Sequence, residues 1–203
     1  MKFTKMHGAG NDYVYVDARS ENRDWNELSR QMSDRHFGVG SDGLILIKDS
    51  DVADLKMSMF NADGSEAEMC GNGIRCFVKY AVDRGIVSDS STSVSVETLA
   101  GIRRVAPIAE NGEVVAARVS MGNPILTPTD VPVKLEPAGE YGSGPLLGYP
   151  FQMDGHDLPL SFVSMGNPHA VTFIDTPVAE FPLHTVGPKM AHHSIFPNRV
   201  NFE

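Results

Sequence analysis

Residues 60–85 read FNADGSEAEMCGNGIRCFVKYAVDRG, and this stretch decides the fold of the chain. Its second half carries an apolar stripe at the i, i+3, i+4, i+7 and i+8 positions, formed by Ile74, Phe77, Val78, Ala81 and Val82. Gly85 follows Arg84, at the place where a glycine commonly ends a helix. We therefore predict a helix over 72–84. Because Cys76 and Tyr80 widen its apolar face, we expect a sheet to pack it on several sides.

Strand patterns flank this helix on both sides along the chain. The predicted strands lie at 13–17, 44–48, 55–60, 94–96, 102–108 and 114–120. Asn111-Gly112 is the expected hairpin turn between the last two. Asp24 is expected to cap a short helix over 25–34. Since strands and helices do not alternate regularly, the predicted fold class is α+β.

The composition of the sequence changes after residue 122, where prolines become frequent. Seven of the 13 prolines lie between 124 and 159, which indicates a crossing between domains followed by irregular strands. Strand patterns resume at 160–165 and 170–174. We therefore predict two domains, 1–122 and 123–203.

Two short segments recur along the chain. The sequence VSMGNP occurs at 119–124 and again at 163–168. The simpler explanation of this repeat is that both segments are strand-to-turn junctions that use the same Gly-Asn-Pro turn. Gly10-Asn11 precedes one predicted strand just as Gly166-Asn167 precedes another. These echoes indicate two related halves.

Composition excludes several classes of protein. The net charge is −9 and no Lys/Arg-rich run occurs, so nucleic-acid binding has no electrostatic basis. The longest aliphatic run, 44–47, is far shorter than the ~20 residues of a membrane span. The first seven residues do not resemble a signal peptide, and two cysteines do not form a disulfide scaffold. We expect a cytoplasmic protein with reduced thiols.

Cys70 is the residue most suggestive of chemistry. It arrives where a polar loop meets the predicted helix, and a helix N-terminus favours a thiolate and can hold a carboxylate or phosphate. Gly71 and Gly73 leave the backbone N–H groups there accessible. The alternative is a buried structural cysteine, which is the expected role of Cys76 inside the helix. A disulfide between them is not expected, because one helix would separate their Cα atoms by ~9 Å. The two cysteines also lack the CxxC or Cys/His spacing of a zinc site.

The other polar candidates are individually weak. Each lies near a glycine or proline, where a turn role is the default for an asparagine: Asn11, Asn61, Asn167 and Asn201. His169 lies at a predicted strand entrance, where a structural hydrogen-bond donor is the more common role.

Taken together, these residues resemble the diaminopimelate epimerase family. The resemblance covers essentially the whole chain and rests on six motifs in order, at 3–12, 38–43, 60–65, 70–73, 165–169 and 196–201. It implies two similar halves, each a curled mixed or antiparallel sheet around a central helix. It also implies cofactor-independent epimerisation of LL-2,6-diaminopimelate to the meso isomer, in lysine and peptidoglycan precursor synthesis, by a homodimer without a metal.

The resemblance implies roles for individual residues. Cys70 would be one of two cysteines that face opposite sides of the substrate α-carbon, and His169 would tune cysteine ionisation. Gly71 and Asn72 would hold the reacting carboxylate at the helix start. The rest of the substrate would be bound by Asn11, Asn61, Asn167 and Asn201.

One element of the family pattern is not found in this sequence. The second cysteine, with its own glycine-rich helix start, is absent, and the spacing of the echoes would place it near residue 226. We therefore expect an amino-terminal part of such an enzyme, with an incomplete second half, that associates readily and does not epimerise its substrate alone.

Three other functions stay open. One is a related racemase acting on proline or hydroxyproline, which would not need the distal asparagines. Another is a cysteine hydrolase with Cys70 as nucleophile and His169 as base. The third is a non-catalytic fragment that binds a ligand or nothing.

Overall fold

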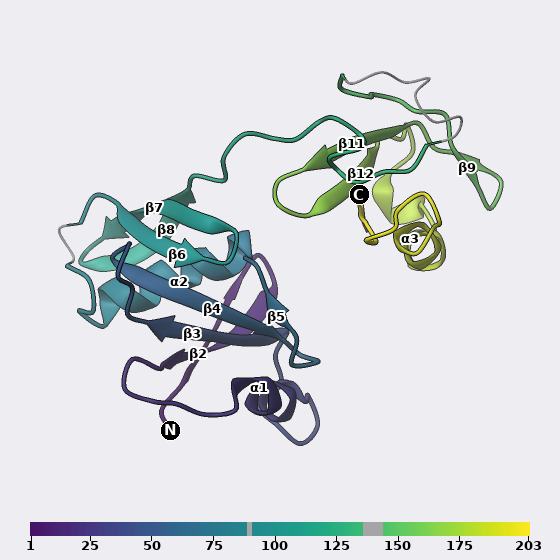
Figure 1. The fold of residues 1–203 in the computed structure, drawn as a ribbon. Helices are drawn as coiled ribbons and strands as arrows, with labels where there is room; N and C mark the ends of the chain where they lie inside the picture. Colours follow the sequence, from purple (N-terminus) through teal and green to yellow (C-terminus); the bar gives the residue numbers. More distant parts are fainter. Residues whose placement is uncertain (89–90, 136–143) are drawn as a thin grey trace. The chain divides into compact units, whose positions relative to one another are not determined.

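The computed structural model describes residues 1–88, 91–135 and 144–203, and the chain forms two compact units, Met1–Met121 and Gly122–Glu203 (Figure 1). Each unit has its own buried core. Among the described residues, no helix has both the length and the apolar character that a membrane crossing requires.

The first unit is built on one mixed sheet. Its strands are β1 (Thr4–Gly8), β2 (Asn11–Asp17), β3 (Gly43–Lys48), β4 (Leu55–Asn61), β5 (Glu66–Ala67), β6 (Val94–Thr98), β7 (Gly101–Glu110) and β8 (Glu113–Val119). They pair in the order β1-β2-β3-β4-β6-β7-β8, with β5 added on β4. The pairs β2–β3 and β4–β6 are parallel, and the other neighbours are antiparallel.

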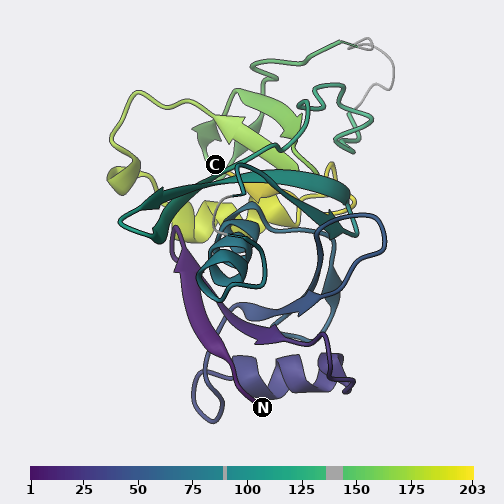
Figure 2. The same ribbon diagram turned by 90° about the vertical axis from the view of Figure 1, so that its left-hand side faces the viewer.

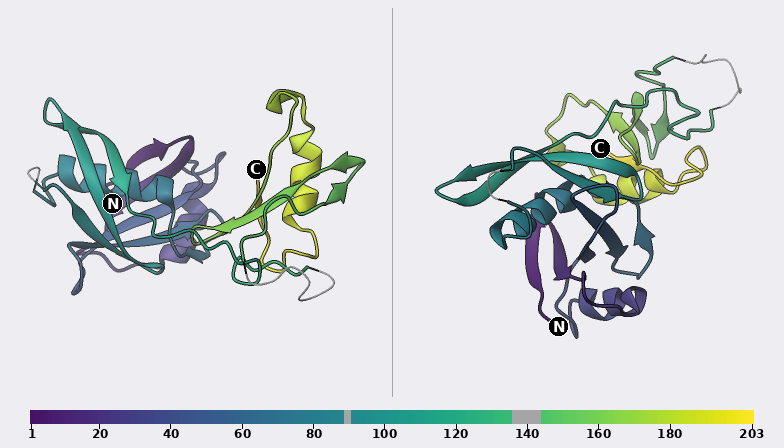
Figure 3. Two further views of the ribbon diagram at one scale, coloured as in Figure 1. Left: turned by 90° about the horizontal axis from the view of Figure 1, so that it is seen from above. Right: turned by 60° about the vertical axis from the view of Figure 1, so that its left-hand side comes forward.

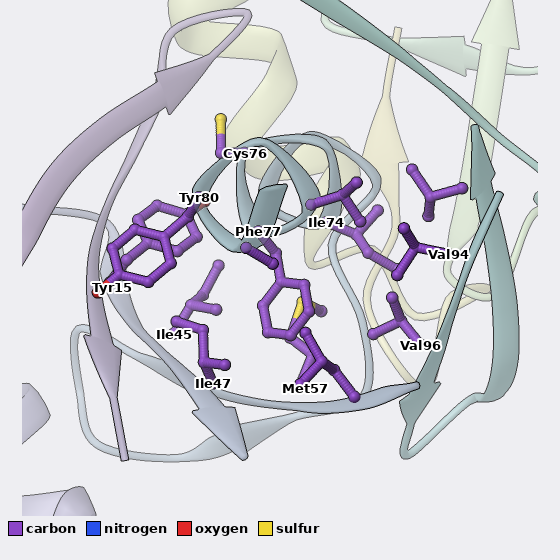
Figure 4. Close-up of a cluster of buried hydrophobic side chains, with 14 of the residues drawn as sticks. Tyr15, Ile45, Ile47, Met57, Ile74, Cys76, Phe77, Tyr80, Val94 and Val96 are labelled. Atoms are coloured by element: carbon purple, nitrogen blue, oxygen red, sulfur yellow. The ribbon is translucent and has the colours of Figure 1, made fainter. Parts of the chain in front are cut away.

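This sheet curls around helix α2 (Gly71–Asp83), as Figure 2 shows. The apolar stripe predicted from the sequence is buried, with Ile74, Phe77, Val78 and Ala81 fully inaccessible. Figure 4 shows strand side chains, including Ile45 and Met57, directed toward Phe77. The fold class and the central helix are therefore confirmed, with the helix beginning and ending one residue earlier than predicted.

Helix α2 ends as the sequence indicates. Gly85 has a positive φ of 66°, and its N–H donates to the carbonyl of Val82. The N–H of Ile86 donates to the carbonyl of Ala81, which completes the pair of bonds that closes a helix at a left-handed glycine.

A second helix, α1 (Trp25–Ser33), covers the opposite face of β2 and β3. Asp24 caps it as predicted, because its side chain accepts a hydrogen bond from the N–H of Glu27. Strands β2 and β3 are thus buried on both faces, which is why 44–47 reads as a continuous aliphatic run rather than an alternation.

Two hairpins show how turn residues set the register of the sheet. Asn111 and Gly112, with φ of 53° and 84°, form the predicted two-residue turn between β7 and β8. Ala9 and Gly10, with φ of 52° and 93°, form a turn of the same kind between β1 and β2. Strand β1 was not predicted from the sequence, because Ala-Gly is a weaker turn signal than Asn-Gly.

The second unit contains smaller sheets. Its elements are β9 (Gln152–Met153), β10 (His156–Asp157), β11 (Leu160–Ser164), β12 (Pro168–Thr172), the 3₁₀ helix η1 (Val178–Glu180), α3 (Leu183–Ala191) and β13 (Asn201–Phe202). The prediction of a strand at 170–174 is wrong in its bounds, because the short hairpin pairs Pro168 with Ser164 and starts the strand directly after the turn. A proline fits there, since the first residue of a strand can lack an N–H donor.

Helix α3 is the largest element that the sequence analysis missed. Gly187 and Pro188 lie inside it and read as helix breakers. The helix forms because Val186 and Met190 are buried in the core of this unit, which also includes Phe162. Figure 3 shows the yellow helix beside the strands of this unit. Tertiary burial therefore outweighs the local signal.

The two units share one arrangement of elements. In the first, the antiparallel pair β1–β2 is followed by α1 and by β3, which lies parallel to β2. In the second, the antiparallel pair β11–β12 is followed by α3 and by β13, parallel to β12. Asn11 and Asn167 stand at equivalent places, each beside a hairpin turn. This is the structural counterpart of the sequence echo and supports two similar halves.

Candidate active site

Cys70 is the N-cap of α2. Its backbone is extended, with φ −130° and ψ 119°, and its carbonyl accepts the N–H of Ile74. Its Sγ atom accepts the N–H of Gly73 at 3.3 Å. The sulfur therefore takes the place of the Ser, Thr, Asp or Asn oxygen that usually caps a helix, and it lies in the positive field of the helix start.

Two glycines let the sheet approach this helix start closely. A Cβ on Gly73 would lie 2.7 Å from Cδ1 of Ile45, and a Cβ on Gly8 would lie 2.8 Å from the carbonyl oxygen of Asn72. Both distances are shorter than van der Waals contact. At Gly8 the close atom belongs to backbone, so packing of β1 against the first turn of α2 requires a glycine there. At Gly73 it is the end of the Ile45 side chain, which would have to shift to admit a Cβ.

A tyrosine from β2 contacts the same sulfur. The O–H of Tyr13 lies 3.5 Å from Sγ of Cys70, while Tyr13 itself is only 5% exposed. Burial, followed by the hydrogen bond to Cys70, raises the pKa of Tyr13 well above its ordinary value. Two residues along the strand, the O–H of Tyr15 donates to the carbonyl of Gly73 at 3.0 Å. Both phenols therefore hold the first turn of the helix.

The first turn of α2 also presents free donors. Within the described residues, no acceptor is found for the backbone N–H groups of Gly71 and Asn72. Gly71 has no side chain, and the atoms nearest to the position of a Cβ there belong to the side chain of Met121. Two such N–H groups beside Sγ can donate to a carboxylate or another anion.

The side chain of Asn72 continues into a chain of hydrogen bonds. Its Nδ2 donates to Oδ1 of Asn11 at 2.7 Å, and Arg75 donates to its Oδ1. Nδ2 of Asn11 donates in turn to Oδ2 of Asp42 at 3.3 Å. Two of the predicted site residues are therefore joined directly, and Asp42 fixes the orientation of the Asn11 amide.

Ion pairs stabilise the β1–β2 hairpin next to these hydrogen bonds. Asp12 forms ion pairs with Lys5 at 3.0 Å and with Arg35 at 2.8 Å, and Arg35 also reaches Asp42. The hydrogen bond from Arg35, aided by Lys5, holds the pKa of the Asp12 carboxyl far below its usual range. This network fixes the strand that carries Asn11 and Tyr13.

Asn61 stands at the same end of the sheet. Residues Tyr13, Gly43 and Asn61 are in register across β2, β3 and β4. Nδ2 of Asn61 donates to Oγ of Ser65 at 3.0 Å, and its backbone carbonyl accepts the O–H of Ser29 at 2.8 Å. The strand register thus places Asn61 in the same row as Tyr13, which contacts Cys70.

The remaining predicted residues form a cluster of their own in the second unit. The imidazole of His169 lies 3.1 Å from Oδ1 of Asn167 through Nε2 and 2.8 Å from the Glu203 carboxylate through Nδ1. Asn201 is in register with His169 on the neighbouring strand, and its Nδ2 donates to the carbonyl of Pro168 at 3.1 Å.

The structure therefore assembles two clusters from the predicted residues. Cys70, Gly71, Asn72 and Asn11 lie together in the first unit, with Asn61 on the same sheet end, while Asn167, His169 and Asn201 lie together in the second. Among the residues that the structure describes, no group of three or more His, Cys, Asp or Glu side chains could hold a metal ion.

Four residues that contact the predicted site residues or the start of α2 were not predicted as part of the site. Tyr13 and Tyr15 were predicted in a strand but not as partners of the helix start. Their spacing of two residues places both side chains on the face toward α2, and this was the available signal. Asp42 and Arg75 gave no local signal, because their partners come from distant parts of the chain.

Comparisons with known proteins show which family this chain resembles in sequence. The family model described as diaminopimelate epimerase matches residues 3–127. A diaminopimelate epimerase of Methanococcus maripaludis strain C5 is 52% identical over 204 residues, covering 100% of this chain and 70% of that protein. The diaminopimelate epimerase of Acetivibrio thermocellus is 48% identical with the same coverage.

Solved structures share the fold at low identity. A PhzF-family phenazine biosynthesis protein of Bacillus anthracis matches with a TM-score of 0.54 and 22% identity, over 85% of this chain and 56% of that one. A hydroxyproline epimerase of Agrobacterium vitis matches with a TM-score of 0.57 and 12% identity, over 84% and 50%. The fold is common to these proteins, whereas identities near 50% over its full length show that the chain belongs to the diaminopimelate epimerase family.

Proposed function

We propose that residues 1–203 carry the Cys70 side of a cofactor-independent epimerase acting on LL-2,6-diaminopimelate. The observation that carries the proposal is the position of Sγ at the N-cap of α2, beside the unpartnered N–H groups of Gly71 and Asn72. The family relatives that bear the name diaminopimelate epimerase supply the substrate.

The proposed step is removal of the substrate α-proton by the Cys70 thiolate. The Cα–H bond breaks, an S–H bond forms, and the electron pair moves from Cα into the adjoining carboxylate. The N–H groups of Gly71 and Asn72 stabilise the charge that develops on the carboxylate oxygens. Their orientation is fixed before the reaction because the first turn of α2 is held by Tyr15 and by the packing of Gly73.

Inversion also requires an acid on the opposite face of Cα. Of the two cysteines of this chain, Cys70 caps α2 and Cys76 is buried within the same helix. We therefore propose that this acid, the second cysteine of the family pattern, is not supplied by residues 1–203. On this basis the chain alone binds substrate but does not produce the meso isomer.

The amides next to this site have the role of binding the distal amino acid of the substrate. Asn11 and Asn61 stand at one end of the first sheet, and both present an amide that can donate to a carboxylate and accept from an ammonium. In the second unit, Asn167 and Asn201 are proposed to bind the same substrate and His169 to tune cysteine ionisation. The contacts of its two ring nitrogens with Glu203 and Asn167 fix the orientation of the imidazole.

Other parts of the proposal concern organisation. The first unit corresponds to the half with the first catalytic cysteine, predicted as 1–122, and the second unit to part of the other half, predicted as 123–203. We further propose that the full-length enzyme is a cytoplasmic homodimer, without cofactor, metal or nucleic acid, in lysine and peptidoglycan precursor synthesis. Sequence relatives with this enzyme name support the pathway.

Substrate protection of Cys70 tests the binding part of the proposal. The chain is alkylated with iodoacetamide at pH 7, and the rate at Cys70 is read from the mass of its peptide, with and without LL-diaminopimelate. We expect protection by diaminopimelate and little by L-lysine, which lacks the second carboxylate. Equal rates with and without diaminopimelate would refute the assignment of the site. Alkylation in a Cys76→Ala background confirms that the signal comes from Cys70.

Proton exchange tests the chemical part. LL-diaminopimelate is incubated with the chain in D₂O and followed by proton NMR, with Cys70→Ala as the control. We expect no meso isomer, and any loss of the α-proton signal has to vanish in Cys70→Ala. Formation of the meso isomer by this chain alone would show that both proton donors lie within residues 1–203 and would overturn the proposed division of the site.

A further inference from the structure

We propose that Tyr13 is a positioning residue for Cys70, whose phenolic O–H donates a hydrogen bond to Sγ and keeps the sulfur anionic and beside the N–H groups of Gly71 and Asn72. This inference rests on the proposed role of Cys70 as the base. It assigns a function to a side chain that belongs to neither the family motif around the cysteine nor the substrate-binding amides.

The geometry gives Sγ two donors from two different elements. The N–H of Gly73 approaches from the helix at 3.3 Å, and the O–H of Tyr13 approaches from β2 at 3.5 Å. A thiolate can only accept hydrogen bonds, so both contacts favour the charged form of the sulfur over the thiol. Two donors also fix the direction of the Cβ–Sγ bond, because the sulfur cannot rotate away without losing one of them.

Tyr13 is rigidly held for this task. Its ring is buried in the core between the sheet and α2, and its strand neighbours in register are Met6 on β1 and Gly43 on β3. The pKa of Tyr13 is raised, chiefly by burial and next by Cys70, so the phenol keeps its proton throughout the neutral range. It therefore remains a hydrogen-bond donor throughout that range.

The other ionisable groups on α2 and β2 near Sγ are either hydrogen-bonded to other partners or neutral. On α2, Arg75 donates to Asn72, and burial raises the pKa of Cys76 so that it stays neutral. On β2, the O–H of Tyr15 is bonded to the carbonyl of Gly73.

Charged groups lie farther out on the remaining elements. Asp12, on the hairpin of β1 and β2, is paired with Lys5 and Arg35, and Asp42, before β3, pairs with Arg35. Glu66 on β5 and Glu68 before the cap are exposed to solvent. Among the described residues, Tyr13 is the ionisable side chain that is hydrogen-bonded to Sγ.

Tyr13→Phe is the direct test, since it removes one oxygen and keeps the ring. The lost donor serves a charged acceptor at long distance, and we expect about a tenfold smaller thiolate population at pH 7. The readout is the rate of Cys70 alkylation by iodoacetamide between pH 6 and pH 10, in a Cys76→Ala background. In Tyr13→Phe the rate is expected to fall about tenfold at pH 7 and to match the parent at the high-pH plateau.

Tyr80→Phe is the matched control. It removes the same atom from another buried tyrosine of the same core, ten positions along the chain from Cys70 and near the other end of α2. A purely structural effect would lower the rates of both variants, or change them equally at all pH values. An unchanged ratio of the pH 7 and plateau rates in Tyr13→Phe, or an equal change of that ratio in Tyr80→Phe, would overturn the proposal.

Folding and substrate binding are followed separately. Circular dichroism and the fluorescence of Trp25, which lies in the first unit, verify that each variant is folded before its rates are compared. If Tyr13→Phe does not fold, the infrared S–H stretch in the Cys76→Ala protein gives the same information, because a strong S–H band at pH 7 would overturn the proposal. Loss of diaminopimelate protection in the parent would instead refute the proposed function and leave the pH profile readable.

Discussion

Gly8→Ala is expected to separate the β1–β2 hairpin from the start of α2. A Cβ at this position would lie 2.8 Å from the carbonyl oxygen of Asn72 and 3.3 Å from its carbonyl carbon. Since ordinary contact begins near 3.4 Å, the two backbones have to move apart by about 0.6 Å. Neither can yield easily, because β1 is paired along its full length with β2 and the helix start is fixed by buried Ile74.

The magnitude follows from two opposing effects. Overpacking against backbone costs ~1–3 kcal/mol of unfolding free energy. Replacing glycine by alanine restricts the unfolded chain and returns ~0.4–1 kcal/mol. We therefore expect the first unit to lose about 1–2 kcal/mol of unfolding free energy in Gly8→Ala. Because the displacement lengthens the hydrogen bond from Asn72 to Asn11, diaminopimelate protection of Cys70 is expected to weaken as well.

Urea unfolding followed by Trp25 fluorescence measures this effect in the right unit. Trp25 is the single tryptophan and is 7% exposed in the first unit. The neighbouring variant Ala9→Gly is a control in which the change has the opposite sign. Ala9 has a φ of 52°, and a glycine adopts this conformation without strain, so we expect the unfolding free energy to rise by about 0.5–1 kcal/mol. The reasoning is refuted if Gly8→Ala unfolds at the same or a higher urea concentration than the parent.

Three further outcomes are expected with the same fluorescence measurement. Phe77→Ala, which empties the centre of the first core, lowers the unfolding free energy by about 3–5 kcal/mol, and a loss below 1 kcal/mol would contradict the packing described for α2. Asp24→Ala removes the cap on the N–H of Glu27 and costs about 1 kcal/mol, whereas Asp24→Asn, which keeps an acceptor, costs less. The pKa of Asp12 is lowered in the folded state by Arg35, so its stabilisation is present above the ordinary carboxyl pKa of 3.8 and is lost as the pH falls below it. Asp12→Asn is therefore expected to destabilise the first unit more at pH 6 than at pH 3, and an equal effect at both would refute the linkage.

Local patterns predicted the first unit well. The helical stripe of α2, the cap of α1 and the Asn111-Gly112 turn each depend on residues within a few positions of one another, and each was confirmed. The sequence also identified Cys70 as a candidate, because a glycine-rich helix start can be read directly. Its role in catalysis stays a prediction.

Features that depend on distant partners were not predicted. Helix α3 contains Gly187 and Pro188, and it forms because burial of Val186 and Met190 outweighs their effect. Strand β1 lacks a strong turn signal and depends on pairing with β2. In both cases the stabilising contacts are made by residues that a window along the sequence cannot identify.

The sequence by itself determined the α+β class, the central helix, the motif order and thereby the family. It could do so because helix period, capping and turn chemistry act over short distances along the chain. Only the tertiary structure decided that Tyr13 touches Cys70, that Asn72 holds Asn11 and that Gly8 must be a glycine. These contacts join residues 57 to 64 positions apart, and the distance between such residues is set by how strands curl around a helix.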